Sequence, residues 1–258
     1  SAVDFVPAHP IAGSEQSGGS AGKDDLFQRR RVIITPGEPL EDGVMQKITA
    51  FWVGLGARVE GMPAEMHDQI YAYISHLPHL LAFAARSVIH VPHLKSDNVA
   101  LQKFLRLSKS KTTLWNEIFF YNRDYVIAAL DRYLAAIIQI QKELAAAPLE
   151  QDNSFDDVLA RTVLFPRIGA ACLISAVMQA EEKAGFSFAR YAGRGFADFT
   201  FPASAPPEKD LEKISYQHQI VGSVTREYIE RLQSWRKMML DNKFDELQES
   251  LAPAPRAA

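Results

Sequence analysis

The chain has 258 residues, of which 47% are hydrophobic and 23% charged, and its formal net charge is −3. This length accommodates one large domain or two modest ones, and the composition is that of a folded globular chain. The weak negative charge argues against a nucleic-acid-binding protein, which would carry a basic stripe. No run of 18 apolar residues occurs, so we expect neither a transmembrane helix nor a membrane partner.

The first 62 residues carry short runs typical of β-strands. These are Val3–Val6, Val32–Thr35 and Ala57–Glu60. Between the second and third runs, Asp42–Leu55 has apolar residues at helical spacing. We therefore predict strand, loop, strand, helix and strand, with Gly13–Ser20 as the longest loop.

From Pro63 onward the pattern changes to long helices. Phe186–Pro207, rich in glycine, proline and aromatic residues, is predicted to be a structured loop, and Ala252–Ala258 a disordered tail. The single cysteine, Cys172, lies in an apolar stretch and is expected to be a small buried side chain. Four stretches have the pattern of buried or amphipathic helices: Ala64–Ile89, Leu114–Ala147, Asp156–Gly185 and Lys209–Glu249.

The helical part contains an internal repeat. A ten-position spacing from aspartate to proline occurs at Asp68–Pro78 and again at Asp156–Pro166, and apolar residues follow each proline. Further on, ALDRYL resembles VTREYI. We hypothesise two related halves, about 63–150 and 151–250; the alternative is that unrelated amphipathic helices share the pattern.

Three groups of residues could carry chemistry. His9 ends a predicted strand before a Gly/Ser loop, where a side chain faces the ligand crevice of an open α/β sheet and can accept a proton near neutral pH. His76 and His79 flank a proline that would kink a helix. Arg106 stands among apolar neighbours, as a partly buried cation that binds a carboxylate would. The plainer alternatives are an exposed loop histidine, a simple kink and a surface arginine.

Four segments taken together resemble a known family. HPIAGSEQSG, RRVIITP, WVGLGARVEGM and MHDQIYAYISHLPH have the order and spacing seen in prephenate, arogenate and cyclohexadienyl dehydrogenases, over about residues 4–135. The resemblance implies NAD- or NADP-dependent oxidative decarboxylation of prephenate or arogenate in tyrosine biosynthesis. It also implies a cytoplasmic homodimer that pairs through its helical domain.

The resemblance further implies an α+β, mostly helical chain. Residues 1–62 would be the C-terminal portion of a Rossmann-like nucleotide-binding α/β domain. Residues 63–258 would form a large helical dimerisation and substrate domain with a possible internal duplication. No nucleic acid or metal is expected as a partner.

The same resemblance assigns roles to single residues. His9 corresponds to the histidine that takes the proton of the substrate hydroxyl group, and Arg106 to the arginine that binds the substrate's side-chain carboxylate. The other matched positions correspond to residues of the substrate pocket or its entrance: His79, Trp115, Ser14 and Glu15.

The chain departs from the family pattern in its second half. The G-F-x-D-x-T segment that normally precedes the arginine is absent before Arg106 and stands instead at 195–200, where Phe201 follows it. Arg167 occupies the repeat position of His79. We expect the second half to be a copy that kept the scaffold, lost its substrate-binding side chains and forms a pseudo-dimer with the first.

A second departure concerns the cofactor. No G-x-G-x-x-G follows a strand and opens a helix, so we expect that loop to lie before residue 1 and this chain to bind NAD or NADP weakly. Two alternatives to a dehydrogenase stay open. One is a non-catalytic helical dimerisation or interaction module derived from the family. The other is a metal-binding helical protein that uses the five histidines of residues 67–93.

Overall fold

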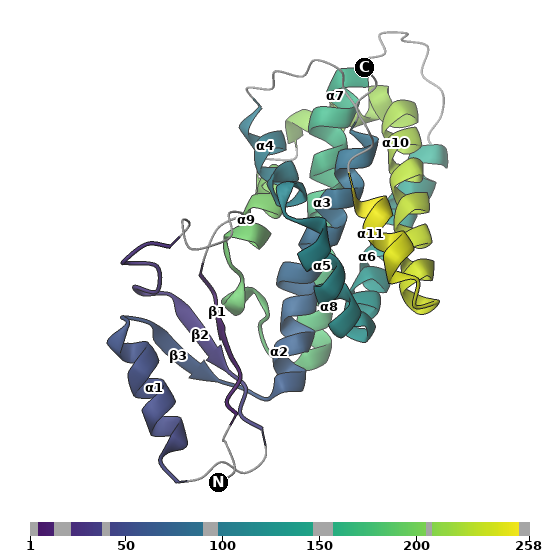
Figure 1. Cartoon of the computed structure of the whole chain (residues 1–258). Coiled ribbons are helices and arrows are strands. Elements are labelled where there is room, and N and C mark those ends of the chain that lie inside the picture. The colour runs from purple at the N-terminus through teal and green to yellow at the C-terminus, as the bar shows by residue number, and fades with distance from the viewer. Residues whose placement is uncertain are drawn as a thin grey trace. The chain divides into compact units, whose positions relative to one another are not determined.

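The structure is a computed structural model that describes residues 5–12, 22–37, 42–89, 98–146, 157–204 and 208–252 (Figure 1). The chain divides into two compact units, residues 1–71 and 72–258. The first unit holds the sheet and two helices, and the second is wholly helical in its described residues. The division falls between Tyr71 and Ala72, so the first helix after residue 63 belongs to the sheet unit.

The first unit is a three-stranded sheet with the order β1-β2-β3. The middle strand runs antiparallel to β1 and parallel to β3, and α1 makes the crossover between the two parallel strands. The apolar run Val32–Ile34 is fully buried, as expected for a central strand covered on both faces. The elements are β1 (Ala8–Pro10), β2 (Arg31–Ile34), α1 (Val44–Gly54), β3 (Arg58–Gly61) and α2 (Ala64–Tyr71).

The predictions for β2, α1 and β3 are confirmed to within one or two residues, but the first strand was predicted in the wrong place. Phe5 and Val6 are not in a strand, whereas Ala8–Pro10 pairs with β2, with His9 opposite Ile33. Residues 3 and 4 lie outside the described part. The apolar run misled the prediction because strand position here is set by hydrogen bonding to β2 rather than by local composition.

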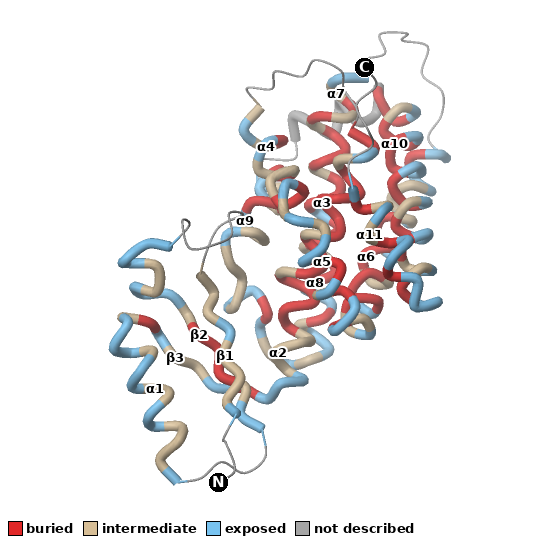
Figure 2. Tube along the Cα trace, viewed as in Figure 1, coloured by how far each residue is buried: buried red, intermediate tan, exposed pale blue. Residues whose placement is uncertain are grey.

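The second unit is a helical bundle. Its longest helices, α6 and α10, pack on each other, α6 also packs on α8, and α10 on α3. Figure 2 shows buried positions concentrated along α3, α8 and α10. The α-helices are α3 (Leu77–Val88), α4 (Val99–Arg106), α5 (Thr112–Tyr121), α6 (Arg123–Ala146), α7 (Asp157–Leu159), α8 (Phe165–Ala184), α9 (Arg194–Thr200), α10 (Glu208–Leu240) and α11 (Phe244–Leu251).

Five shorter helical segments complete this unit. The two π-helical segments are η2 (Ala72–His76) and η4 (Ala160–Leu164). Each leads directly into a long helix whose second residue is a proline. A proline has no N–H and clashes with the carbonyl four residues before it, so a widened turn relieves the conflict without ending the helix. The 3₁₀ segments are η3 (Leu107–Lys109), η5 (Ala189–Tyr191) and η6 (Phe201–Ser204).

Two helical predictions need correction. The stretch Leu114–Ala147 is not one helix, because it breaks at Asn122, whose side-chain nitrogen lies 2.9 Å from Nδ1 of His76. The predicted loop Phe186–Pro207 contains the helix α9 and two 3₁₀ segments. Glycine and proline lower its intrinsic helix propensity, but packing against α4 and α8 overrides that tendency.

The helical stretch Asp157–Ala184 is long and apolar enough to cross a membrane by length and composition alone. The sequence pattern did not predict any such segment. Of its most apolar window, 61% is buried inside the bundle, as in a core helix of a globular protein. Cys172 lies on this helix and is buried, as predicted, and burial raises the pKa of its thiol to about 12.

Phe104 on α4 stacks on Phe199 of α9, with ring centroids 4.3 Å apart, and both rings are fully buried. We predict that Phe104→Ala lowers the free energy of unfolding by about 3–5 kcal/mol, because it leaves a cavity between these helices. Urea unfolding followed by circular dichroism at 222 nm measures this. Tyr121→Ala is the matched control: its ring is 84% exposed, and we expect a change within about 0.5 kcal/mol. Equal effects of the two variants would contradict the packing argument.

Candidate functional site

In the first unit, three polar side chains form a hydrogen-bonded chain that ends at His9. His9 lies in β1, and its Nδ1 is 2.8 Å from Nε2 of His67 on α2. Nδ1 of His67 is in turn 2.9 Å from Oδ1 of Asp68. The ring of Tyr71 packs against both imidazoles, at centroid distances of 5.0 Å and 4.5 Å.

This geometry assigns the tautomers when Asp68 is ionised. A carboxylate only accepts hydrogen bonds, so Nδ1 of His67 carries a proton and donates it to Asp68. A neutral His67 then offers the lone pair of Nε2, and Nδ1–H of His9 donates to it. The lone pair of His9 Nε2 is thereby left as a proton acceptor.

The pKa of His9 supports this role. It lies at about 4 instead of the ordinary 6.5, because desolvation first and repulsion from His67 second lower it, while attraction to Asp68 opposes both effects. His9 is therefore neutral at pH 7, although part of its ring is exposed. A neutral imidazole held by a second group and a carboxylate has the arrangement of a general base and its orienting partners.

In the second unit, His79 stacks on Trp115. The ring centroids are 3.4 Å apart with an interplanar angle of 18°. Nδ1–H of His79 donates to the Ser75 carbonyl at 2.8 Å, so its Nε2 carries a lone pair. Burial lowers the pKa of His79 to about 3, with the Ser75 hydrogen bond opposing the change. His79 is thus a neutral, oriented hydrogen-bond acceptor.

Arg106, the last residue of α4, is held by a buried carboxylate from α9. Its Nε lies 2.5 Å from Oδ2 of Asp198, whose side chain is 8% exposed. Nε of Arg194 lies 3.5 Å from the same oxygen. The ion pair fixes the plane of the guanidinium group, whose five donors match the geometry of a carboxylate.

Helix α9 also reaches His79. A Cβ on Gly195 would lie 3.3 Å from a methyl of Leu107 and 3.9 Å from Cε1 of His79. The absence of a side chain at this glycine lets α9 approach both the imidazole and the end of α4. The described residues of the second unit therefore gather His79, Trp115 and Arg106 around α9.

The structure does not bring every predicted residue into view. Ser14 and Glu15 lie outside the described residues, and His9 belongs to the other unit. Sequence reasoning gave no catalytic role to His67 and Asp68, although they stand in the MHDQIY segment that carried the family resemblance. The signal that could have found them is a histidine followed directly by an aspartate at the start of a predicted helix.

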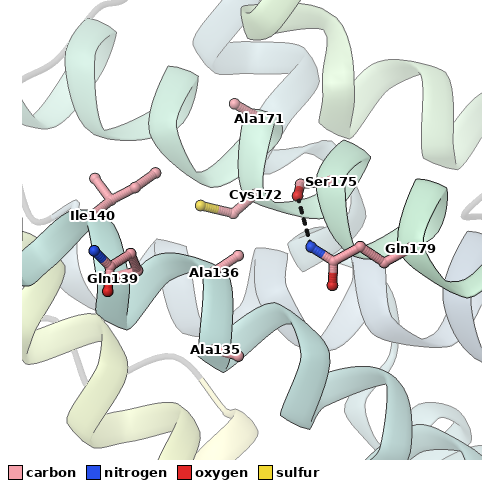
Figure 3. Close-up of a pocket in the computed structure, with 8 residues that line it drawn as sticks. All are labelled: Ala135, Ala136, Gln139, Ile140, Ala171, Cys172, Ser175 and Gln179. Atoms are coloured by element: carbon pink, nitrogen blue, oxygen red, sulfur yellow. Dashed lines mark hydrogen bonds between the residues drawn. The ribbon is translucent and has the colours of Figure 1, made fainter.

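A hollow between α6 and α8 lies apart from these residues (Figure 3). Small and apolar side chains line much of it, and Gln179 donates to the Ser175 hydroxyl at 3.3 Å on one side. Among the residues that the structure describes, neither a charged side chain nor a predicted site residue lines the hollow. Its lining residues are Ala135, Ala136, Gln139, Ile140, Ala171, Cys172, Ser175 and Gln179.

The histidine-rich stretch of residues 67–93 raises the question of a metal site. Within the described ranges, no three His, Cys, Asp or Glu residues are placed to hold a metal ion. His90 and His93 lie outside those ranges. The expected absence of a metal stays a prediction for the whole chain.

Comparison with known proteins decides the family. Residues 1–61 match the model described as prephenate dehydrogenase, nucleotide-binding domain, and residues 63–159 match prephenate dehydrogenase, dimerization domain. The two matches of 61 and 97 residues together cover 158 of 258 positions. The chain belongs to the prephenate dehydrogenase family. The predicted fold, a Rossmann-like α/β portion followed by a large helical domain, is confirmed.

Individual relatives agree with this family. The chain is 31% identical over 158 residues to a cyclohexadienyl dehydrogenase of Zymomonas mobilis, which covers 58% of this chain and 53% of the relative. It is 29% identical over 150 residues to a prephenate dehydrogenase of Bacillus subtilis, covering 55% and 40%. A crystal structure of a putative prephenate dehydrogenase from Corynebacterium glutamicum aligns with a TM-score of 0.50 and 25% identity, over 57% of this chain and 49% of the other. The chain spans about half the length of these curated relatives or less.

The nucleotide-binding match raises the question of whether residues 1–61 can hold a dinucleotide. In this family that match implies a glycine-rich turn between a strand and a helix for the pyrophosphate. No G-x-G-x-x-G occurs in this segment, and the N-cap of α1 is the single glycine Gly43, at φ 85°. The residues present do not fit the phosphate half of the cofactor.

His79 makes the stability of the helical unit depend on pH. Its folded-state pKa of about 3 lies below the ordinary 6.5, so the unfolded chain gains a proton first as the pH falls. The stabilisation is complete above pH 6.5 and is lost progressively below it. As the pH falls from 6.5 to 5, we expect this residue to lower the free energy of unfolding by up to about 1.4 kcal/mol per pH unit.

Urea unfolding of the wild type and of His79→Phe at several pH values measures this contribution. The phenylalanine keeps an aromatic ring on Trp115 but cannot titrate. The free energy of unfolding of the variant should therefore depend less steeply on pH than that of the wild type. Parallel curves for the two proteins would mean that His79 is not held neutral.

Proposed function

We propose that this protein is a prephenate or arogenate dehydrogenase of tyrosine biosynthesis. The reaction is an NAD- or NADP-dependent oxidative decarboxylation of a cyclohexadienyl substrate to an aromatic product. Family membership supports the reaction class. The single observation that carries the chemistry is the chain from Asp68 through His67 to a neutral His9.

In the proposed mechanism, His9 accepts the proton of the substrate hydroxyl group. Loss of hydride from the carbon that bears this hydroxyl creates carbonyl character, and the hydroxyl proton must leave as it forms. Nε2 of His9 takes the proton, while Nδ1–H keeps its bond to His67. Asp68 holds His67 in the required tautomer and stabilises the positive charge that develops on the pair.

Arg106 is proposed to bind the substrate's side-chain carboxylate. The Asp198 ion pair orients the guanidinium group before the substrate arrives, which reduces the entropy lost on binding. His79 offers a neutral acceptor beside α9, and Trp115 supports it by stacking. Ser14 and Glu15 are proposed as polar residues at the pocket entrance on the family resemblance alone.

The proposed partners follow the same reasoning. The substrate is a small carboxylate, and the helical unit is a dimerisation module whose pairing partner is a like helical domain. The homodimer predicted from the sequence is one way to supply that partner. The cytoplasmic location and the expected absence of nucleic-acid and membrane partners stay predictions.

The test of the function is turnover of prephenate and of arogenate with NAD⁺ and with NADP⁺, by the protein as the cell produces it. His9→Gln should lower kcat by about 10²–10⁴, because the general base is lost while the pocket remains. KM should change little. Unchanged turnover in His9→Gln would falsify the catalytic assignment, and no turnover by the wild type with either substrate would remove the proposed function.

The pH profile of the same protein tests the two orienting residues. Activity should fall as the pH drops through the His9 pKa of about 4, because a protonated His9 cannot accept a proton. His67→Gln removes a repulsion and should move this acid limb to higher pH. Asp68→Asn removes an attraction and should move it to lower pH. Shifts in the same direction, or none, would show that the two residues do not act through His9.

Cofactor binding by the 258-residue chain should be weak. Without the glycine turn the pyrophosphate has no ring of backbone N–H donors to bind. Isothermal titration of this chain with NAD⁺ and with NADP⁺ measures the affinity, with the cell-produced protein as the reference. A Kd in the low micromolar range for this chain would contradict the expectation and place the phosphate site within residues 1–258.

A further inference from the structure

The helical unit is built from two series of elements in the same order. In each series a five-residue π segment leads into a long helix whose second residue is proline: η2 into α3 with Pro78, and η4 into α8 with Pro166. The separation along the chain is 88 positions both between Ala72 and Ala160, which begin the π segments, and between Pro78 and Pro166. π segments are rare, so two in register are hard to assign to chance.

Each series continues in the same way. A short helix runs into a 3₁₀ segment, as α4 into η3 and as α9 into η6, and a long helix comes later, α6 in one series and α10 in the other. The first series has the additional helix α5 before α6, and the second has the additional 3₁₀ segment η5 before α9. The packing repeats as well. Helix α6 packs on α8 as α10 packs on α3, and α4 contacts η4 as α9 contacts η2. These paired contacts are those of a two-fold arrangement.

Two aromatic pairs mark the two-fold axis. Phe104 stacks on Phe199 at 4.3 Å, and the hydroxyl of Tyr133 donates to that of Tyr228 at 3.5 Å. The members of each pair are 95 positions apart. In a symmetric pair of subunits, residues on the axis contact their own equivalents, and these four side chains do so within one chain.

A third contact shows that the symmetry has diverged in chemistry while keeping its geometry. Arg106 of the first series meets Asp198 of the second. The position 95 residues after Arg106 is Phe201, and the position 95 residues before Asp198 is Lys103. These two equivalents are also in contact, because Nζ of Lys103 lies over the Phe201 ring, 3.6 Å from its centroid. An ion pair on one side of the axis corresponds to a cation–π contact on the other.

We infer that residues 160–251 are a second, diverged copy of residues 72–146, and that the two copies form a pseudo-dimer within the chain. The second copy occupies the place in which a dimerisation domain would receive another chain. It completes the first copy by supplying Asp198 to Arg106. In the second copy, Phe201 stands at the position equivalent to Arg106, so each pair of copies carries one carboxylate-binding arginine at this position. That last count rests on the proposed function, whereas the pseudo-dimer does not.

The experiment rebuilds the missing ion pair on the other side of the axis. Phe201→Arg alone removes the cation–π contact and sets an arginine beside Lys103, so its Tm should fall by about 2–6 °C. Lys103→Asp alone should also lower the Tm. The double variant K103D/F201R should recover most of the combined loss, because the new pair repeats the geometry of Arg106 and Asp198. Phe201 is 37% exposed, so the larger side chain can be accommodated.

The control is K109D/F201R, which has the same net charge but places the new aspartate on an exposed residue at the end of η3. The Tm changes caused by K109D and by F201R should simply add in this control. All Tm values are measured from about 1 to 100 µM chain, with the mass determined by light scattering, and the recovery in K103D/F201R should not depend on concentration. A double variant as unstable as the sum of its singles would overturn the equivalence of the two positions. A recovery lost on dilution would overturn the internal pairing, because the contact would then join two chains. Neither readout requires catalytic activity.

Discussion

Aromatic contact in the core of the helical unit holds α4 against α9, and the polar residues around α9 depend on it. The Phe104–Phe199 stack is fully buried and sets the distance between the two helices. At that distance Asp198 reaches Arg106, and the missing side chain of Gly195 leaves room for His79 and Leu107. Burial of the rings stabilises this contact by several kcal/mol, more than an exposed ion pair could contribute. The ion pair therefore orients the arginine, while the aromatic packing holds the helices.

The sheet unit depends on a different constraint, the register between β1 and β2. His9 pairs opposite Ile33, and this register directs its side chain toward α2. A slip of one residue would turn the imidazole to the other face of the sheet and break its contact with His67. The fully buried run Val32–Ile34 resists such a slip because it has to stay in the core. The strand that holds the proposed base is thus positioned by a strand that carries no chemistry.

Two histidines with proposed roles, one in each unit, are both kept neutral, but for different purposes. His9 donates its Nδ1–H to His67 and keeps a lone pair on Nε2, which suits a group that accepts a proton and is then stabilised by Asp68 through His67. His79 lies in the helical unit, where its ring stacks on Trp115 and its Nδ1–H donates to the backbone carbonyl of Ser75. It is suited to accept a hydrogen bond without changing charge. Both pKa values are lowered mainly by desolvation, which stabilises the neutral form.

The sequence by itself determined the family, the α/β character of the first 62 residues and the mostly helical character of the chain after Pro63. It also predicted His9, His79 and Arg106 as candidate site residues. These follow from short motifs and from periodicities that repeat over a few turns. The Asp-to-Pro spacing also predicted the repeat that we infer above, because a proline in a helix imposes the same local strain wherever it occurs.

Only the tertiary structure decided which distant side chains contact the candidate site residues. It moved the first strand to Ala8–Pro10, made a helix of residues 194–200, and joined His9 to His67 and Arg106 to Asp198. These pairs are 58 and 92 positions apart, and no local pattern encodes which distant side chain completes a buried charge or a neutral imidazole. Burial decides which side chains pair, because a polar group removed from water must form a hydrogen bond with whichever group the packing brings within reach.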